Sequence, residues 1–307
     1  MTFAGSPDRV EARLAPEAGY EFDSFRISGL PRRPGTELVR ALLLAGQAPR
    51  ACGKILAARR PDVVLGGGGY VAGPMVLAAA RRRLPAALME ADAHLGLANR
   101  LAAPLARRVF LSYPISGRDG PKYVVTGRPI PESSRPVERA EARRRFELPP
   151  EGPVVLVFGG SQGSRTLNEL ALDAWAKQGP AVLHLSGDRY WAELSPRVSR
   201  PDYKLLPFTK EFGAALGAAD LVVARAGGSI WEVAAAGKPA VVVPFPHATA
   251  DHQSANARYF GGGVQIVTDA EAARVVPGLV AELLARARPD AAEDIAEGVL
   301  ALVEAGR

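Results

Sequence analysis

One stretch of the C-terminal half combines residue types that suit binding of a nucleotide. Leu221–Ala224 is a short apolar run typical of a buried parallel strand, and Gly227-Gly228 follows it as a turn that side chains would obstruct. Ser229 is a favourable N-cap for the predicted helix that comes next. A strand, a glycine turn and a helix N-terminus together present backbone N–H groups to a phosphate. Glu232, in the first helical turn, can accept hydrogen bonds from two neighbouring hydroxyls, such as those of a ribose.

A second stretch begins after the next predicted strand, Ala240–Val243. It runs from Pro244 to Asn256 and includes His252 and Gln253. Its composition is polar and rich in amides, unlike that of a protein core, and it suits a surface that hydrogen-bonds a sugar.

Two further glycine loops lie between a strand and a helix. Gly66–Gly69 follows Val63–Leu65 and precedes Tyr70, and Gly159–Ser164 follows Pro153–Phe158. Consecutive glycines allow the backbone to approach a ligand closely, and the alternative for the first loop is simple flexibility. Ser161 offers a hydroxyl to a phosphate, but no Gly-Lys-Ser/Thr follows, so this is not a Walker loop.

Polar residues also follow the predicted strand Ala86–Met89. Glu90, Asp92 and His94 lie where parallel sheets bind ligands, at the carboxyl end of a strand. Asp92 has a second interpretation, as the N-cap of a helix that continues to Ala106.

The elements that position these loops alternate between strand and helix in both halves. This order predicts an α/β protein with two doubly wound, Rossmann-like domains. We expect an N-terminal domain over 1–130, a proline-rich linker that ends at Pro131, a C-terminal domain over 131–285, and a closing helix over 286–307.

The composition restricts the class of partner. The 307 residues carry a net charge of +6, which favours a nucleotide, a nucleic acid or an acidic lipid surface, unless the arginines are simply solvated. The basic helical stretch Thr36–Arg60 could face lipid headgroups or be an ordinary amphipathic helix. Cys52 is the single cysteine, and neither a membrane-spanning run nor a signal peptide is recognisable. Metal-binding spacings are absent from the sequence, so we expect no metal.

Taken together, these motifs resemble the MurG family of UDP-N-acetylglucosamine transferases. The resemblance rests on five segments, which cover the chain from about Gly5 to the last helix: Gly-Gly-Tyr-Val-Ala-Gly-Pro at 68–74, Gly-Leu-Ala-Asn-Arg at 96–100, Gly-Gly-Ser-Gln-Gly at 159–163, and the two stretches described first. It implies the GT-B fold, with two Rossmann-like domains, and an inverting, metal-independent transfer without a cofactor.

The resemblance also implies a role for individual residues on the donor side. Ser161 would contact the diphosphate, the backbone of Thr209 the uracil, and Glu232 the ribose. Gln253, helped by Asn256, would bind the sugar hydroxyls. The remaining donor-side residues are Arg225 and, for the diphosphate and sugar, Gly228, Ser229 and Ile230.

On the acceptor side, the resemblance implies that the first glycine loop receives a lipid-linked diphosphate. The residues concerned are Gly67, Gly68, Gly69 and Tyr70, with Asp92 facing the sugar and acceptor.

Four departures from the family pattern concern the site. Glu90-Ala-Asp92 replaces the usual Glu-Gln-Asn, and the loop from Arg225 to Glu232 is one residue shorter than in many members. Pro131 stands where many members have an arginine, for which Arg128 or Arg135 could substitute.

The fourth departure is the lack of the family's first strand and of the glycine loop whose histidine is a proposed catalytic base. His94 and His252 are fallback candidates for that base, although a supporting or surface role is favoured for each. Without the first strand, the N-terminal sheet would lack its middle, and Met1 would not be the natural start.

The sequence therefore predicts transfer of N-acetylglucosamine from UDP-N-acetylglucosamine to undecaprenyl-diphosphate-linked lipid I, giving lipid II. The enzyme would lie in the cytoplasm, on the inner face of the cell membrane, with no nucleic acid partner. The alternatives are a GT-B transferase with another lipid or glycan acceptor, and an inactive UDP-sugar-binding protein.

Overall fold

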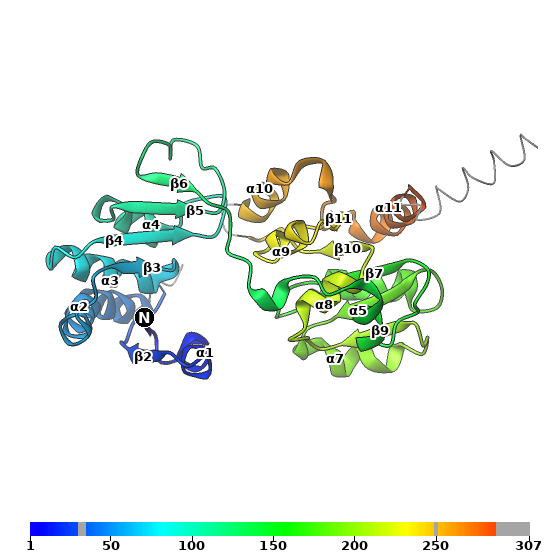
Figure 1. The fold of residues 1–307 in the computed structure, drawn as a ribbon, viewed down its shortest axis with the longest axis horizontal. Coiled ribbons are helices and arrows are strands. Elements are labelled where there is room, and N and C mark those ends of the chain that lie inside the picture. Colours follow the sequence, from blue (N-terminus) through cyan, green and yellow to red (C-terminus); the bar gives the residue numbers. More distant parts are fainter. Residues whose placement is uncertain (30–34, 249–250, 287–307) are drawn as a thin grey trace, which may run out of the picture. The chain divides into compact units, whose positions relative to one another are not determined.

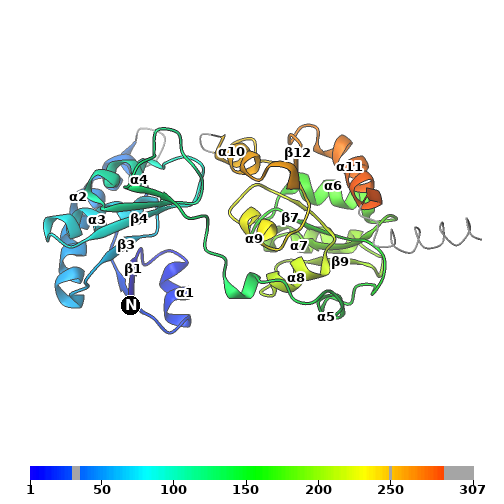
Figure 2. The same cartoon turned by 45° about the horizontal axis from the view of Figure 1, so that its top comes forward.

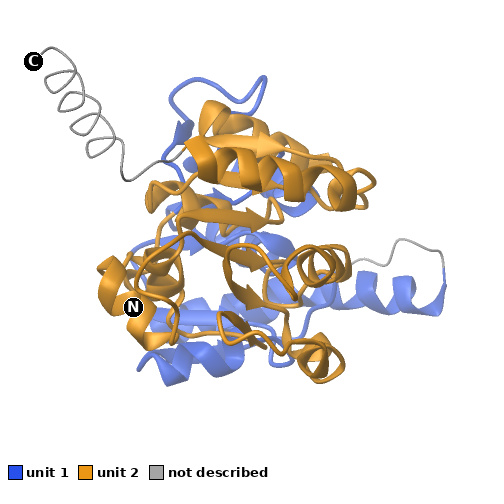
Figure 3. Ribbon diagram, turned by 90° about the vertical axis from the view of Figure 1, so that its right-hand side faces the viewer, with its two compact units in different colours: residues 1–128 blue, residues 129–307 orange. Residues whose placement is uncertain are grey.

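The computed structural model describes residues 1–29, 35–248 and 251–286. The chain divides into two compact units, Met1–Arg128 and a second unit that begins at Pro129 (Figure 3). The predicted closing helix over 286–307 lies outside the described residues, except for Arg286. None of the helices in the described ranges is long and apolar enough to cross a membrane.

Unit 1 contains short strands and the helices that connect them (Figure 1). In chain order the elements are β1 (Thr2–Gly5), α1 (Glu11–Glu17), β2 (Glu21–Ser24), α2 (Thr36–Arg59), β3 (Val64–Gly66), α3 (Gly69–Arg81), β4 (Ala86–Glu90), α4 (Leu97–Ala102), the 3-10 turn η1 (Ala103–Leu105), β5 (Arg108–Leu111) and β6 (Tyr123–Val125).

The strands of unit 1 form two separate sheets. β1 pairs in parallel with β2. The strands β3, β4, β5 and β6 form a parallel sheet in that order (Figure 1), and Figure 2 shows β3 beside β4. Within the described part of the chain, no ladder joins β1 to β3. Helices α2 and α3 pack against each other and contribute Cys52, Leu56 and Val76 to the buried core of the unit.

Unit 2 alternates strands and helices more regularly. Its elements are the 3-10 turn η2 (Glu132–Ser134), α5 (Arg139–Arg145), β7 (Val154–Phe158), α6 (Arg165–Trp175), β8 (Ala181–Leu185), α7 (Asp188–Leu194), η3 (Ser195–Arg197), β9 (Tyr203–Leu206), α8 (Phe212–Ala218), β10 (Leu221–Ala224), α9 (Ile230–Ala235), β11 (Ala240–Val242), α10 (His252–Tyr259), η5 (Gly261–Gly263), β12 (Val264–Ile266) and α11 (Ala272–Arg286).

One six-stranded parallel sheet, in the order β12-β11-β10-β7-β8-β9, forms the centre of unit 2. Helices α5, α8, α9 and α10 contribute to the core on one face, and α6, α7 and α11 to the core on the other. Because both faces are covered, β7 and β10 are buried along their whole length, as their unbroken apolar sequences predict. Unit 2 is therefore a doubly wound α/β domain.

A buried ion pair ties α5 to this sheet. The Arg143 side chain is only 1% exposed, and its Nη2 lies 2.7 Å from Asp220 Oδ2. The same carboxylate oxygen accepts a hydrogen bond from the backbone N–H of Val154, at the start of β7. Burial lowers the pKa of the Arg143 guanidinium, and the Asp220 charge opposes that shift.

Candidate functional site

The strand order of unit 2 locates its site. From β7 the chain proceeds outward through β8 and β9, then returns to β10 on the other side of β7. Ligands of open α/β sheets bind outside the carboxyl ends of the strands at such a switch point. The loops after β7 and β10 begin at Gly159 and Arg225, so both glycine loops that the sequence singles out in this half meet there.

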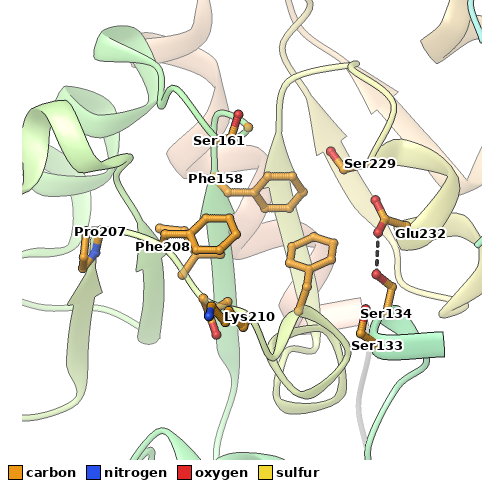
Figure 4. A pocket seen from close by; sticks show the side chains of 13 residues that line it. Ser133, Ser134, Phe158, Ser161, Pro207, Phe208, Lys210, Ser229 and Glu232 are labelled. Carbon is orange, nitrogen blue, oxygen red and sulfur yellow. Dashed lines mark hydrogen bonds between the residues drawn. The ribbon is translucent and has the colours of Figure 1, made fainter. Parts of the chain in front are cut away.

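A pocket of about 290 Å³ lies at this switch point (Figure 4). Its volume is close to the lower limit of about 300 Å³ for small-molecule sites. Its lining combines the aromatic rings of Phe158, Phe208 and Phe212 with the polar groups of Ser161, Ser229 and Glu232. The complete lining is Ser133, Ser134, Phe158, Gly160, Ser161, Leu185, Pro207, Phe208, Thr209, Lys210, Phe212, Ser229 and Glu232. Aromatic rings together with hydroxyls and a carboxylate suit a flat base with a sugar attached.

Four of the predicted donor-side residues are thus brought together from three loops: Ser161, Thr209, Ser229 and Glu232. The Thr209 hydroxyl accepts a hydrogen bond from the backbone N–H of Glu211, which fixes the turn before α8. The contact of each residue with a donor stays a prediction.

The start of α9 differs in detail from the expectation. Ser229 occupies the N-cap position, but its side chain makes no capping hydrogen bond. The backbone N–H of Ile230 donates to Gly227 O at 3.2 Å, and that of Glu232 to Ser229 O at 3.0 Å. A diphosphate bound here would share those donors with the turn. Ile230 itself is buried, so only its backbone is available to a ligand.

The loop that carries Ser161 is held by glycine contacts. A Cβ on Gly163 would overlap the carbonyl oxygen of Ser186, and a Cβ on Gly187 would lie 2.6 Å from Gly163 N. The two turns therefore touch through their backbones, which requires glycine on both sides. Ser164 caps α6 by accepting from Leu167 N–H at 3.4 Å.

Arg225 was predicted to bind the donor, and the structure gives it several protein partners. Its Nε donates to Ser164 Oγ at 3.0 Å, and Nη1 donates to the carbonyl oxygens of Val243 and Pro244. Nη1 also lies 2.5 Å from Asp269 Oδ1. Arg225 therefore joins the loops after β7, β10 and β11, and a direct contact with a ligand stays a prediction.

The predicted sugar-binding residues lie on α10, which the sequence did not identify as a helix. Gln253 Oε1 accepts a hydrogen bond from Phe245 N–H at 2.9 Å. Asn256 is fully buried, and its Nδ2 donates to Ala226 O at 3.3 Å. These bonds hold α10 against the loops after β10 and β11. His252, a candidate base, is half-buried at the first position of α10.

In unit 1, the four glycines from the end of β3 onward play different structural roles. A Cβ on Gly66 would lie 2.8 Å from Leu88 Cδ2, so this glycine lets β3 pack closely. Gly68 has a φ of +95° and forms the N-cap of α3. Gly67 and Gly69 face open space, which leaves room for a ligand. Helix α3 begins at Gly69 and not at Met75 as predicted, because Gly73-Pro74 is accommodated in its first turns.

Glu90 organises the loop after β4. Its Oε1 accepts from the backbone N–H groups of Ala91 and Asp92, and its Oε2 accepts from Gly96 N–H and from Asn99 Nδ2, both at 2.9 Å. Helix α4 consequently begins at Leu97 with Gly96 at its N-cap.

The alternative interpretation of Asp92 as an N-cap is therefore wrong, since Asp92 lies well before α4 begins. Asp92 and His94 are half-buried in the same loop. Tyr70, on α3, accepts a hydrogen bond from Arg9 Nε at 2.9 Å.

Sequence reasoning missed part of the pocket. Phe158, Phe208 and Phe212 resemble ordinary core residues in the sequence, and Ser133 and Ser134, which follow the predicted linker, had no predicted role. The sequence did contain a signal for the segment that carries the two serines. Gly213 and Gly217 are four residues apart on α8, a spacing that indicates close approach of another backbone segment to that helix.

Comparison with known proteins decides the family. Residues 2–111 match the glycosyltransferase family 28 N-terminal domain, and residues 154–293 match the glycosyltransferase family 28 C-terminal domain. The UDP-N-acetylglucosamine–N-acetylmuramyl-(pentapeptide) pyrophosphoryl-undecaprenol N-acetylglucosamine transferase of Salinibacter ruber is 36% identical over 99% of this chain and 89% of its own length. The enzyme of the same name from Rubrobacter xylanophilus is 37% identical over 98% of this chain and 95% of its own. The chain belongs to the MurG family of glycosyltransferases.

Solved structures agree with this family. The crystal structure of Acinetobacter baumannii MurG has a TM-score of 0.71 and 28% identity, covering 92% of this chain and 82% of that one. The calicheamicin glycosyltransferase CalG4, at a TM-score of 0.62 and 17% identity, shares the fold alone. Both units thus have the α/β architecture of the GT-B fold, as the sequence predicted.

Proposed function

We propose that this glycosyltransferase moves N-acetylglucosamine from UDP-N-acetylglucosamine to lipid I, forming lipid II. The pocket at the switch point of unit 2 carries this proposal, together with relatives of that named activity that match nearly the whole chain. Its aromatic rings suit the uracil, and Glu232 provides a carboxylate for the ribose. Ser161 and Ser229 lie at the end of the pocket where the diphosphate would follow (Figure 4).

In this reaction the acceptor's own hydroxyl attacks the sugar, so no covalent enzyme intermediate is needed. The chain must hold UDP, stabilise the charge that develops on the leaving diphosphate, and remove a proton from the attacking hydroxyl. We assign the first two tasks to the loops after β7, β9 and β10. Gly67 and Gly69, with open space around them, are our candidates for receiving the acceptor diphosphate. The base stays unassigned, with His94 and His252 as candidates.

An assay with radiolabelled UDP-N-acetylglucosamine and a short-chain lipid I analogue tests the proposal. We expect transfer that depends on the intact pocket, with Glu232→Ala as the impaired variant. The matched control is Glu271→Ala, an exposed position of the same unit outside the pocket. Binding of UDP without transfer to the lipid I analogue would exclude this acceptor and favour another lipid or glycan.

We further propose that unit 1 contacts the cytoplasmic membrane through α2. Val39, Leu42 and Leu43 are spaced so that they share one helix face, and they are between 54% and 62% exposed. Arg40 and Arg50 on the same helix are exposed too. An apolar face with flanking arginines suits an anionic lipid surface.

Flotation with vesicles that contain phosphatidylglycerol tests this contact. Val39→Glu should reduce the bound fraction, whereas Val10→Glu, at an equally exposed valine (59%) of unit 1, should not. Equal binding by wild type and Val39→Glu would contradict the assignment of this face.

A further inference from the structure

The short segment that follows the linker lines part of the pocket. Ser133 and Ser134, in η2, lie only a few residues after the boundary between the units, and both line the pocket (Figure 4). Ser134 is 4% exposed, and its Oγ donates a hydrogen bond to Glu232 Oε1 at 2.5 Å. The bond links residues 98 positions apart in the chain. A buried hydroxyl is therefore directed at the carboxylate to which we assign the ribose.

Helix α8 fixes this segment by backbone contact. A Cβ on Gly213 would overlap the Arg135 carbonyl oxygen, and a Cβ on Gly217 would overlap the Val137 carbonyl oxygen. Val137 N–H also donates to Gly213 O at 3.3 Å. The two glycines lie one turn apart on one helix face. Without side chains, they let the backbone from Ser133 to Val137 pack directly against α8. A larger residue at either glycine would displace this segment and move Ser134 away from Glu232.

We propose that Ser134 is a positioning residue for recognition of the nucleotide ribose. An ionised carboxylate accepts hydrogen bonds at both oxygens, and its terminal torsion is soft. By donating to Oε1, Ser134 fixes that torsion and leaves Oε2 for the ribose hydroxyls. Among the described residues, Ser134 is the only one that hydrogen-bonds to the Glu232 carboxylate. Since a serine is neutral, it orients the carboxylate without neutralising its charge. This inference rests on the proposed function, because it assumes that Glu232 binds the ribose.

Titration calorimetry with UDP and with 2′-deoxy-UDP tests the inference on the full chain. We expect Ser134→Ala to weaken UDP binding about 5- to 10-fold, the effect of losing one hydrogen bond that orients a charged acceptor. The loss for 2′-deoxy-UDP should be smaller, because that ligand lacks one of the hydroxyls that Glu232 would bind. Ser134→Thr retains the hydroxyl and should restore most of the affinity. In a Glu232→Ala background, Ser134→Ala should have no further effect.

A purely structural role gives a different pattern. If Ser134 only held its own segment in place, Ser134→Ala would weaken binding of UDP and of 2′-deoxy-UDP equally. It would also weaken binding in the Glu232→Ala background. Either result would overturn the inference. So would unchanged UDP affinity in Ser134→Ala when Glu232→Ala binds weakly. Failure of the wild-type chain to bind UDP would instead refute the proposed function on which the inference rests.

A second pair of variants tests the contact between α8 and the segment from Ser133 to Val137. Gly213→Ala should weaken UDP binding at least as much as Ser134→Ala, because its Cβ would displace the segment that carries the serine. Gly278→Ala is the matched control, since Gly278 is also helical in unit 2 and its Cβ would meet nothing within 4 Å. Wild-type affinity in a folded Gly213→Ala variant would refute the proposed positioning through α8.

Discussion

Acidification should destabilise unit 2 through one buried histidine, His184 on β8. Its side chain is 0% exposed, with Nδ1 2.9 Å from the Tyr203 hydroxyl and Nε2 3.0 Å from Asn168 Oδ1. Asn168 Nδ2 donates to Ser186 O, so its Oδ1 is the acceptor and the neutral imidazole has both nitrogens hydrogen-bonded. Burial lowers the pKa of His184 from 6.5 to about 3.

The direction and size of the effect follow from this pKa. An unfolded chain binds a proton at His184 below about pH 6.5, whereas the folded chain does not until about pH 3. Above pH 6.5 the buried His184 makes its full contribution to the free energy of unfolding. That contribution is lost as the pH falls from 6.5 to about 3. At pH 5 the difference corresponds to about 2 kcal/mol of unfolding free energy relative to neutral pH.

Urea denaturation between pH 7.5 and pH 5 measures this loss. His184→Gln removes the titration and should flatten the pH dependence by about that 2 kcal/mol, after its own constant cost is subtracted. His252→Gln, at a half-buried histidine of the same unit, is the matched control. An equal slope in wild type and His184→Gln would refute the reasoning.

Three further substitutions test the site and the core, and a fourth serves as a control. Glu232→Ala should weaken UDP binding by about 1 to 3 kcal/mol through loss of a charge-assisted hydrogen-bond pair, and calorimetry that shows unchanged affinity would remove Glu232 from the ribose site. Gln253→Ala should reduce discrimination between N-acetylglucosamine and N-acetylgalactosamine donors more than UDP affinity; kinetics with equal losses for both donors would contradict this. Asp220→Ala should cost about 3 to 5 kcal/mol in urea denaturation, because it leaves the Arg143 charge buried and unpaired. Glu17→Ala, which breaks an exposed pair, should cost under about 1 kcal/mol.

The sequence predicted several strands of unit 2 and the glycine loops that follow β7 and β10, but not β12. β10 was predicted at its observed limits and β7 within one residue, because unbroken apolar runs between glycine loops have few other structures available. Ser161 and Glu232 were assigned to one donor site through the family resemblance, and both line the same pocket.

Other features depended on contacts that no local pattern contains. Helices α7 and α10 were missed because neither shows the apolar periodicity of a buried helix face, and most of their residues are polar or exposed. Nothing in the sequence distinguishes an arginine that binds a ligand from one such as Arg225, whose partners are carbonyl oxygens and an aspartate. The Ser134–Glu232 bond joins distant segments and could be found only from the fold.

The continuity of the pocket along the chain has an evolutionary consequence. Every residue that lines it lies between Ser133 and Glu232, within unit 2. A recombination breakpoint just before η2 would transfer the whole pocket, including Ser134, to a new N-terminal partner. A breakpoint after Ser134 would separate the serine from Glu232 and from the α8 glycines that hold it in place. Natural or engineered chimeras of such transferases should therefore inherit nucleotide recognition intact only when the exchanged block begins ahead of the two serines.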